Sequence, residues 1–131
     1  MSTAELYIAI SGDDFDPDLI TSLLNVSPTS SHRKGDSLKF NKNASFSQWC
    51  ISTGRVESNN PDFYELSASL VNKLSNKVDD ILALKNQYKL SVTLQAALKC
   101  DKNSCNPIIG FDKDTIRFLS TIGASIDVDI Y

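Results

Sequence analysis

Alternating apolar and polar residues mark three segments of the chain as β-strands with one buried face and one exposed face. The clearest segment runs from Leu90 to Lys99, and the same pattern recurs over residues 5–11 and 126–131. Residues 46–53, where Trp49 is expected in the core, and residues 106–110 are predicted as further strands. Strands of this kind favour an antiparallel or mixed sheet that helices cover on one side only.

A long amphipathic helix is predicted across this sheet, over residues 64–87. Its apolar residues recur at steps of three and four, which is the spacing of one helix face. The residues that carry this pattern are Leu66, Leu70, Leu74, Val78, Ile81 and Leu82.

Two shorter helices are predicted to begin at a repeated phrase, F-D-x-D-x-I, which occurs at residues 15–20 and 111–116. Asp16 and Asp112 stand at the N-cap position, where a carboxylate accepts backbone N–H groups, and the flanking Phe and Ile are placed for a hydrophobic staple. Asn25 and Gly123 are expected to end these helices, because both residue types adopt left-handed backbone conformations readily.

The order of these elements predicts a single α+β domain over residues 1–131. We expect a mixed, mostly antiparallel sheet with helices packed on one face and a polar opposite face. Residues 27–35 and 53–61, rich in Ser, Asn, Gly and Pro, are expected to be loops within this domain.

Charge and composition narrow the function classes. The chain has 16 acidic and 13 basic residues and a net charge of −3, so it lacks the basic footprint of a direct nucleic-acid ligand. It has neither a secretory leader pattern nor an apolar run of about 18 residues, which predicts a cytoplasmic protein without a membrane segment. One histidine limits acid–base and zinc chemistry, and three cysteines, an odd number, indicate reduced thiols. We therefore expect no cofactor and no enzymatic activity.

An acidic run over residues 13–18 follows the first strand and carries the strongest hint of chemistry. Its position resembles the nucleophile loop of aspartate-dependent phosphatases and could also bind a divalent metal. Helix capping already explains Asp16 and Asp18, and the chain lacks a later carboxylate pair to complete such a site. We predict no metal site, which leaves Asp13 and Asp14 unexplained.

Three weaker patterns have ordinary structural interpretations. Residues 30–35 could cradle an anion, although a solvated turn is favoured, and nothing in the sequence places His32 beside Cys50 as a nucleophile pair. Cys100 and Cys105 could close a small loop or bind a metal, but free thiols beside a hairpin are favoured because zinc needs four ligands.

The polar face of the predicted sheet is the most informative surface. It would combine aromatic and acidic side chains, which suits a partner-binding surface as well as a simply solvated one. Charge also concentrates at the start of the chain, where the first 18 residues contain five acidic residues and no basic residue. Such a pole could steer a basic partner. The side chains expected on the polar face are Tyr7, Thr93, Asp127, Asp129 and Tyr131.

Four motifs, in this order, resemble a bacterial family known as domain of unknown function 4279. They are S-G-D-D-F-D-P at residues 11–17, R-K-G-D at 33–36, S-T-G at 52–54 and G-A-S-I-D-V-D-I-Y at 123–131. The resemblance implies a small single-domain protein with no catalytic residues to transfer. Some members look like immunity proteins of toxin systems, including contact-dependent growth inhibition.

We therefore expect an immunity protein that binds and occludes a cognate toxin domain, such as a nuclease of a contact-dependent growth inhibition system. The alternatives are a non-enzymatic small-ligand or protein-binding module unrelated to toxins, and a metal-dependent hydrolase using Asp13 and Asp14. Carboxylates suit the immunity function because they can occupy the phosphate positions on the basic surface of a nuclease toxin. The predicted partner-binding residues are Asp13, Asp14, Asp36, Asp127, Asp129 and Tyr131.

Overall fold

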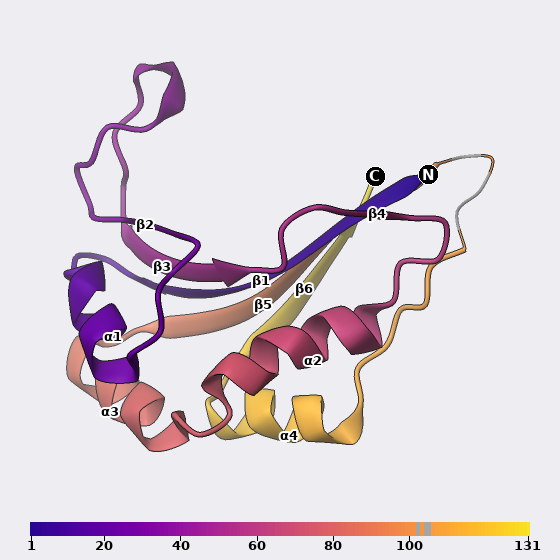
Figure 1. Cartoon of the computed structure of the whole chain (residues 1–131). Helices are drawn as coiled ribbons and strands as arrows, with labels where there is room; N and C mark the ends of the chain where they lie inside the picture. The colour runs from indigo at the N-terminus through magenta and orange to yellow at the C-terminus, as the bar shows by residue number, and fades with distance from the viewer. Residues whose placement is uncertain (102, 104–105) are drawn as a thin grey trace.

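A mixed β-sheet covered by helices on one face makes up the fold (Figure 1). The computed structural model describes residues 1–101, 103 and 106–131. Helices and strands each make up about a third of the chain, which confirms the predicted α+β class. The described elements are β1 (Ser2–Gly12), α1 (Pro17–Leu24), β2 (Ser30–His32), the short 3-10 helix η1 (Lys39–Asn41), β3 (Ser47–Ser52), β4 (Val56–Ser58), α2 (Phe63–Leu74), α3 (Val78–Tyr88), β5 (Ser91–Lys99), α4 (Lys113–Thr121) and β6 (Ser125–Ile130).

Strand β1 organises the sheet. The strand order is β2-β3-β1-β5-β6, and β4 also pairs with β1. All described pairings are antiparallel except that of β5 with β6. In Figure 1 the helices α1, α2, α3 and α4 lie under one face of the sheet, and the connection between β2 and β3 rises as a hairpin from the opposite side.

The core lies between the sheet and the helices. Even-numbered residues of β1 from Ala4 to Ile10 point into it and are at most 1% exposed, as the alternating pattern predicts. Trp49 of β3 is fully buried, and its indole Nε1 donates a hydrogen bond of 3.0 Å to Thr21 Oγ1 of α1. This bond holds α1 against the sheet while it satisfies the buried indole N–H.

The repeated acidic phrase caps two helices, as predicted. The Asp16 carboxylate accepts the Asp18 N–H at 3.0 Å, and the Asp112 carboxylate accepts the Thr115 N–H at 2.8 Å. Asn25 ends α1 in a left-handed conformation, and Gly123 follows α4 with a φ of +68°. The hydrophobic staple differs between the copies, because Ile20 is buried whereas Ile116 is 51% exposed.

The single long helix predicted over residues 64–87 is wrong, because the chain forms α2 and α3 with a turn between them. The Lys77 N–H donates to Leu74 O at 2.9 Å in this turn. Ser75 and Asn76 are poor helix formers, and the acidic pair Asp79–Asp80 suits a new first turn. The break lets α3 pack against α1 while α2 packs against β1 and α4. None of the helices in the described part of the chain is long and apolar enough to cross a membrane.

The other differences from the predicted strands and loops lie in short segments. Residues 106–110 form an isolated bridge, Asp62 to Ile108, and no strand, since Pro107 lacks the N–H that a continued ladder needs. The predicted loops at 27–35 and 53–61 contain the short edge strands β2 and β4. Three-residue strands are too short to show an alternating pattern.

A buried serine joins two loops that lie far apart in the sequence. Ser47 is fully buried, and its Oγ accepts the Phe15 N–H at 3.1 Å and the Lys34 N–H at 3.0 Å. One hydroxyl therefore satisfies a backbone donor from the loop after β1 and another from the loop after β2. This contact fixes the two loops side by side.

Replacing Ser47 by alanine should lower the free energy of unfolding by about 1–3 kcal/mol, because a buried N–H of Phe15 and a partly buried N–H of Lys34 lose their acceptor. Ser31→Ala on the neighbouring strand β2, where the side chain is exposed, is the matched control and should change stability little. Denaturant unfolding measures both variants. Equal stability of the two variants would contradict the role assigned to Ser47.

Asp112 makes the stability of α4 depend on pH. Hydrogen bonds from the Thr115 N–H and hydroxyl hold the pKa of the Asp112 carboxyl below its ordinary value of 3.8. A lowered folded-state pKa stabilises the fold fully above the unfolded pKa, and this contribution declines as pH falls through the folded-state pKa.

Asp112→Asn should therefore lower the melting temperature near neutral pH, and its difference from the unsubstituted protein should shrink as pH falls below 3.8. Asp114→Asn, in the same first turn, is the control for removal of one charge near the helix dipole. Melting curves across acid pH measure the effect. A difference that stays constant or grows in acid would contradict it.

Candidate functional site

The face of the sheet opposite the helices is polar, and we call it the open face. It is made by the side chains that alternate with the buried ones on each strand, including Tyr7 of β1, Gln95 of β5 and Asp127 of β6, which lie in one cross-strand row. The ionisable side chains that strand alternation brings to this face are Glu5, Tyr7, His32, Cys50, Glu57, Lys99, Asp127 and Asp129. Carboxylates therefore predominate over cations on the open face.

Tyr7 lies at the centre of this face. Its hydroxyl donates a hydrogen bond to Gln95 Oε1, and the neighbouring Glu5 carboxylate accepts one from Ser52 Oγ at 2.6 Å. Partial burial raises the pKa of the Tyr7 phenol above 10.0, with smaller contributions from the negative charges of Cys50, Glu5 and Asp127. The phenol thus stays protonated and can serve as a hydrogen-bonding group.

Two shallow hollows adjoin at Tyr7. One, of about 140 Å³, lies over β1, β5 and β6, and the other, of about 240 Å³, lies over β1, β2 and β3. Both are smaller than the usual volume of a small-molecule pocket, about 300–1,000 Å³. The first is lined by Tyr7, Gln95, Ala96, Ala97, Asp127 and Asp129. The second is lined by Glu5, Tyr7, Thr29, Ser30, Gln48, Cys50 and Ser52.

Asp127 and Asp129 lie on the open face as predicted, and both side chains are exposed. Tyr131, which follows β6, is 67% exposed. The structure thus brings Asp127 and Asp129 together with Tyr7, and the strand register places Thr93 on the same face, as predicted. Asp13, Asp14 and Asp36 lie in loops outside the sheet.

Asp13 and Asp14 form ion pairs with the basic loop. Asp14 Oδ1 lies 3.2 Å from Arg33 Nε, and Asp13 Oδ1 lies 3.3 Å from Lys34 Nζ. The two charge clusters that the sequence shows separately therefore neutralise each other at the loops that Ser47 joins. These pairs are exposed, so each adds little stability, but they reduce the charge that the N-terminal acids present to a partner.

Asp36 has a local role in the same hairpin. Its Oδ2 accepts the Arg33 N–H at 2.7 Å, and its backbone N–H donates to Arg33 O at 2.9 Å. These bonds close a turn at the base of the hairpin. The favoured interpretation of residues 30–35 as a turn, and not an anion cradle, fits the pairing of Arg33 and Lys34 with Asp14 and Asp13.

The described cysteines differ in oxidation state, because Cys50 is a free thiol and Cys100 is disulfide-bonded. Burial raises the pKa of the Cys50 thiol, partly offset by a hydrogen bond with Ser30, so Cys50 lacks the lowered pKa of an activated nucleophile. Cys100 is disulfide-bonded, so the expectation of three reduced thiols is wrong for this residue. An odd cysteine count excludes complete pairing but does not exclude one bond. Cys105 lies outside the described residues, and so does any prediction that concerns it.

Across residues 1–101, 103 and 106–131, no group of three or more His, Cys, Asp or Glu side chains is arranged to hold a metal ion. In the acidic run, Asp13 and Asp14 turn to Arg33 and Lys34 while Asp16 caps α1.

The tip of the hairpin between β2 and β3 carries exposed apolar side chains, which the sequence patterns do not predict. Phe40 is 90% exposed there and has a φ of +62°, in the left-handed region, and Leu38 beside it is 43% exposed. A single phenylalanine between Lys39 and Lys42 fits neither a strand pattern nor a helix pattern. This mismatch is the feature of the sequence that indicates an exposed aromatic residue.

The position of Asp127 beside Tyr7 can be tested by titration. We expect the phenol of Tyr7 to titrate with a pKa above 10.0, and Tyr7→Phe should remove that step from an ultraviolet absorbance titration. Asp127→Asn should lower the pKa of this tyrosine without restoring its ordinary value, since burial is the larger cause. Asp18→Asn, on α1, is the control. An unchanged high titration step in Tyr7→Phe would contradict the assignment.

Comparison with known proteins gives a family for the chain. The model of the family described as "Domain of unknown function (DUF4279)" matches residues 2–131. No curated protein and no solved structure matches the chain. Because the family model covers nearly every residue, the chain belongs to the family of this domain of unknown function.

Proposed function

We propose that this protein is an immunity protein that binds a cognate toxin domain through the open face and blocks the toxin's substrate surface. The observation that carries the proposal is the placement of Asp127, Asp129 and Glu5 around Tyr7 on a sheet face that none of the described α-helices covers. Such a face offers carboxylates and an aromatic ring to a partner, a combination suited to a protein interface.

The charge of the open face favours a basic partner. Lys99 is the lysine that strand alternation brings to this face, at the end of β5 and opposite Thr3. A nuclease toxin of a contact-dependent growth inhibition system binds phosphates through a basic surface, and carboxylates that cover this surface occupy the phosphate positions. Attraction between the two surfaces would speed association and weaken with salt.

A small-ligand role is the alternative that the hollows raise. Both hollows are below the usual pocket volume, so the shape of the open face favours a protein partner over a small ligand. A protein-binding role unrelated to toxins uses the same surface and differs in the identity of the partner, which the following experiment determines.

The test uses the partner captured from the native host with the intact protein as bait. Expression of that partner should be toxic, and co-expression of the unsubstituted chain should protect the cells. Asp127→Asn combined with Asp129→Asn should slow association about tenfold at low salt and reduce protection, because two carboxylates leave the interface.

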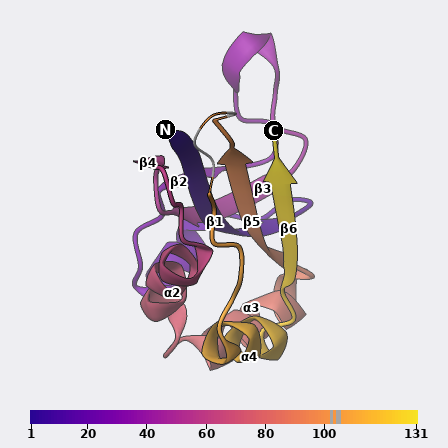
Figure 2. The same ribbon diagram turned by 90° about the vertical axis from the view of Figure 1, so that its right-hand side faces the viewer.

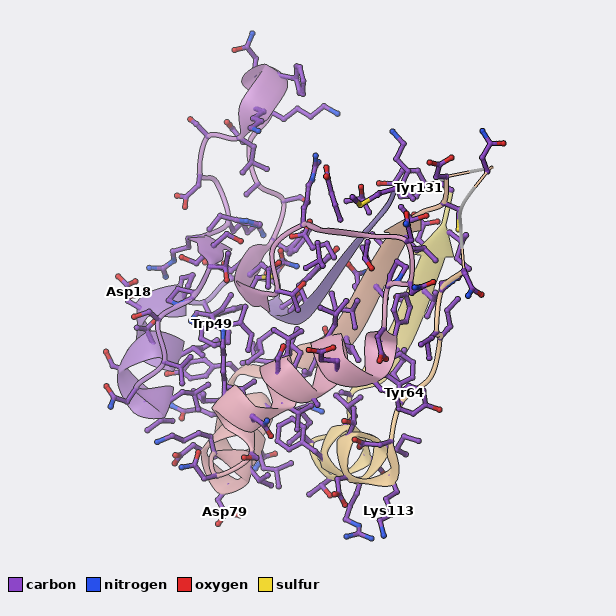
Figure 3. All side chains as sticks on the ribbon, turned by 45° about the vertical axis from the view of Figure 1, so that its right-hand side comes forward. Asp18, Trp49, Tyr64, Asp79, Lys113 and Tyr131 are labelled. Atoms are coloured by element: carbon purple, nitrogen blue, oxygen red, sulfur yellow. The ribbon has the colours of Figure 1, made fainter. Side chains whose placement is uncertain are left out.

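Asp79→Asn combined with Asp114→Asn is the matched control, with the same change in net charge on the helical layer. Figure 3 shows Asp79 and Tyr131 at opposite ends of the molecule. This control should associate and protect like the unsubstituted chain. A non-toxic partner would contradict the immunity role, and equal association rates for both double variants would contradict the open face as the interface.

A further inference from the structure

In the part of the chain that the structure describes, no strand pairs with β6 on the side away from β5, so β6 is an open edge of the sheet. It pairs with β5 and is the last strand in the sheet order (Figure 2). Just beyond β6, the Tyr131 N–H donates to Leu98 O at 2.9 Å, and Tyr131 O accepts the Cys100 N–H at 3.1 Å. Tyr131 therefore directs its peptide groups toward β5. Since these directions alternate along a strand, the N–H and C=O of Ile126, Val128 and Ile130 point to the open edge.

The two faces of β6 differ in chemistry. Toward the helices it presents Ile126, Val128 and Ile130, which are 38%, 43% and 54% exposed. Toward the open face it presents Asp127 and Asp129. The sequence pattern predicts burial of the three apolar residues, but β6 lies at the edge where the helices do not cover them. Exposed apolar side chains beside unpaired peptide groups are a template for strand pairing.

The charges of β6 disfavour a second copy of this chain as the occupant. In an antiparallel pair of two β6 strands centred on Val128, Asp127 of each copy lies opposite Asp129 of the other. Moving one strand by two residues places Asp127 opposite Asp127 of the other copy, and moving it the other way places Asp129 opposite Asp129. Like charges directly opposite each other destabilise a strand pair, so each register with nearly full overlap is penalised.

A strand that alternates basic and apolar residues has the complementary chemistry. Its basic side chains would lie beside Asp127 and Asp129, and its apolar side chains would cover Ile126, Val128 and Ile130. We propose that β6 binds an extended basic–apolar segment of a partner protein as an additional strand of the sheet. The inference rests on the proposed function, because it specifies how a basic partner engages the open face at its β6 edge.

A peptide of about eight residues that alternates arginine and valine, blocked at both ends and fluorescently labelled, is the probe. Fluorescence anisotropy should show binding to the intact protein and much weaker binding of the same peptide with glutamate in place of arginine. Val128→Pro removes the outward N–H without removing a bond to β5, and should weaken binding about tenfold. Val128→Thr keeps the N–H and the branched side chain and should stay within about threefold.

A second probe avoids any effect of proline on folding. The same peptide, N-methylated on alternate residues so that it cannot donate to β6, should bind the unsubstituted protein about tenfold more weakly than the parent peptide. No binding of the parent peptide, or equal binding of the methylated peptide, would overturn strand addition. The proposed function would survive that result if neutralising Asp127 and Asp129 still slowed association with the captured partner.

Discussion

The structure depends on the burial of one face of β1. This strand pairs with β3, β4 and β5. Its alternation of buried and exposed side chains therefore determines which side chains of the neighbouring strands face the core and which face the open side. Leu6 and Ile8 lie in the core, which leaves Glu5 and Tyr7 on the other side. A shift of one residue would exchange the two sets. The open face is thus a direct consequence of how the core forms.

Patterns that act over a few residues predict most of the fold. Alternation identifies β1, β5 and β6, and the repeated caps locate α1 and α4, because these features depend on neighbouring residues. The division of residues 64–87 into α2 and α3 depends on packing against other elements and therefore could not be derived from periodicity. For the same reason, the pattern at Ile126 and Val128 predicts a buried face where the sheet in fact ends.

The charge distribution divides the acids into groups with different roles. Asp16 and Asp112 cap helices, while Asp13 and Asp14 pair with Lys34 and Arg33. Alternation alone places Asp127 and Asp129 on the open face, but only the folded chain shows that the two N-terminal acids already face cations about 20 residues away. The acidic start of the chain therefore contributes to loop structure, while Glu5, Asp127 and Asp129 place carboxylates on the open face.

Amide hydrogen exchange of the protein, alone and bound to the partner captured from its host, tests most directly whether the open face and β6 form the binding surface. Binding should slow exchange at the edge-facing amides of Ile126, Val128 and Ile130. Exchange in α1 and α3, on the other side of the sheet (Figure 1), should change little. Protection concentrated in α1 and α3, with exchange in β6 unchanged, would contradict this prediction.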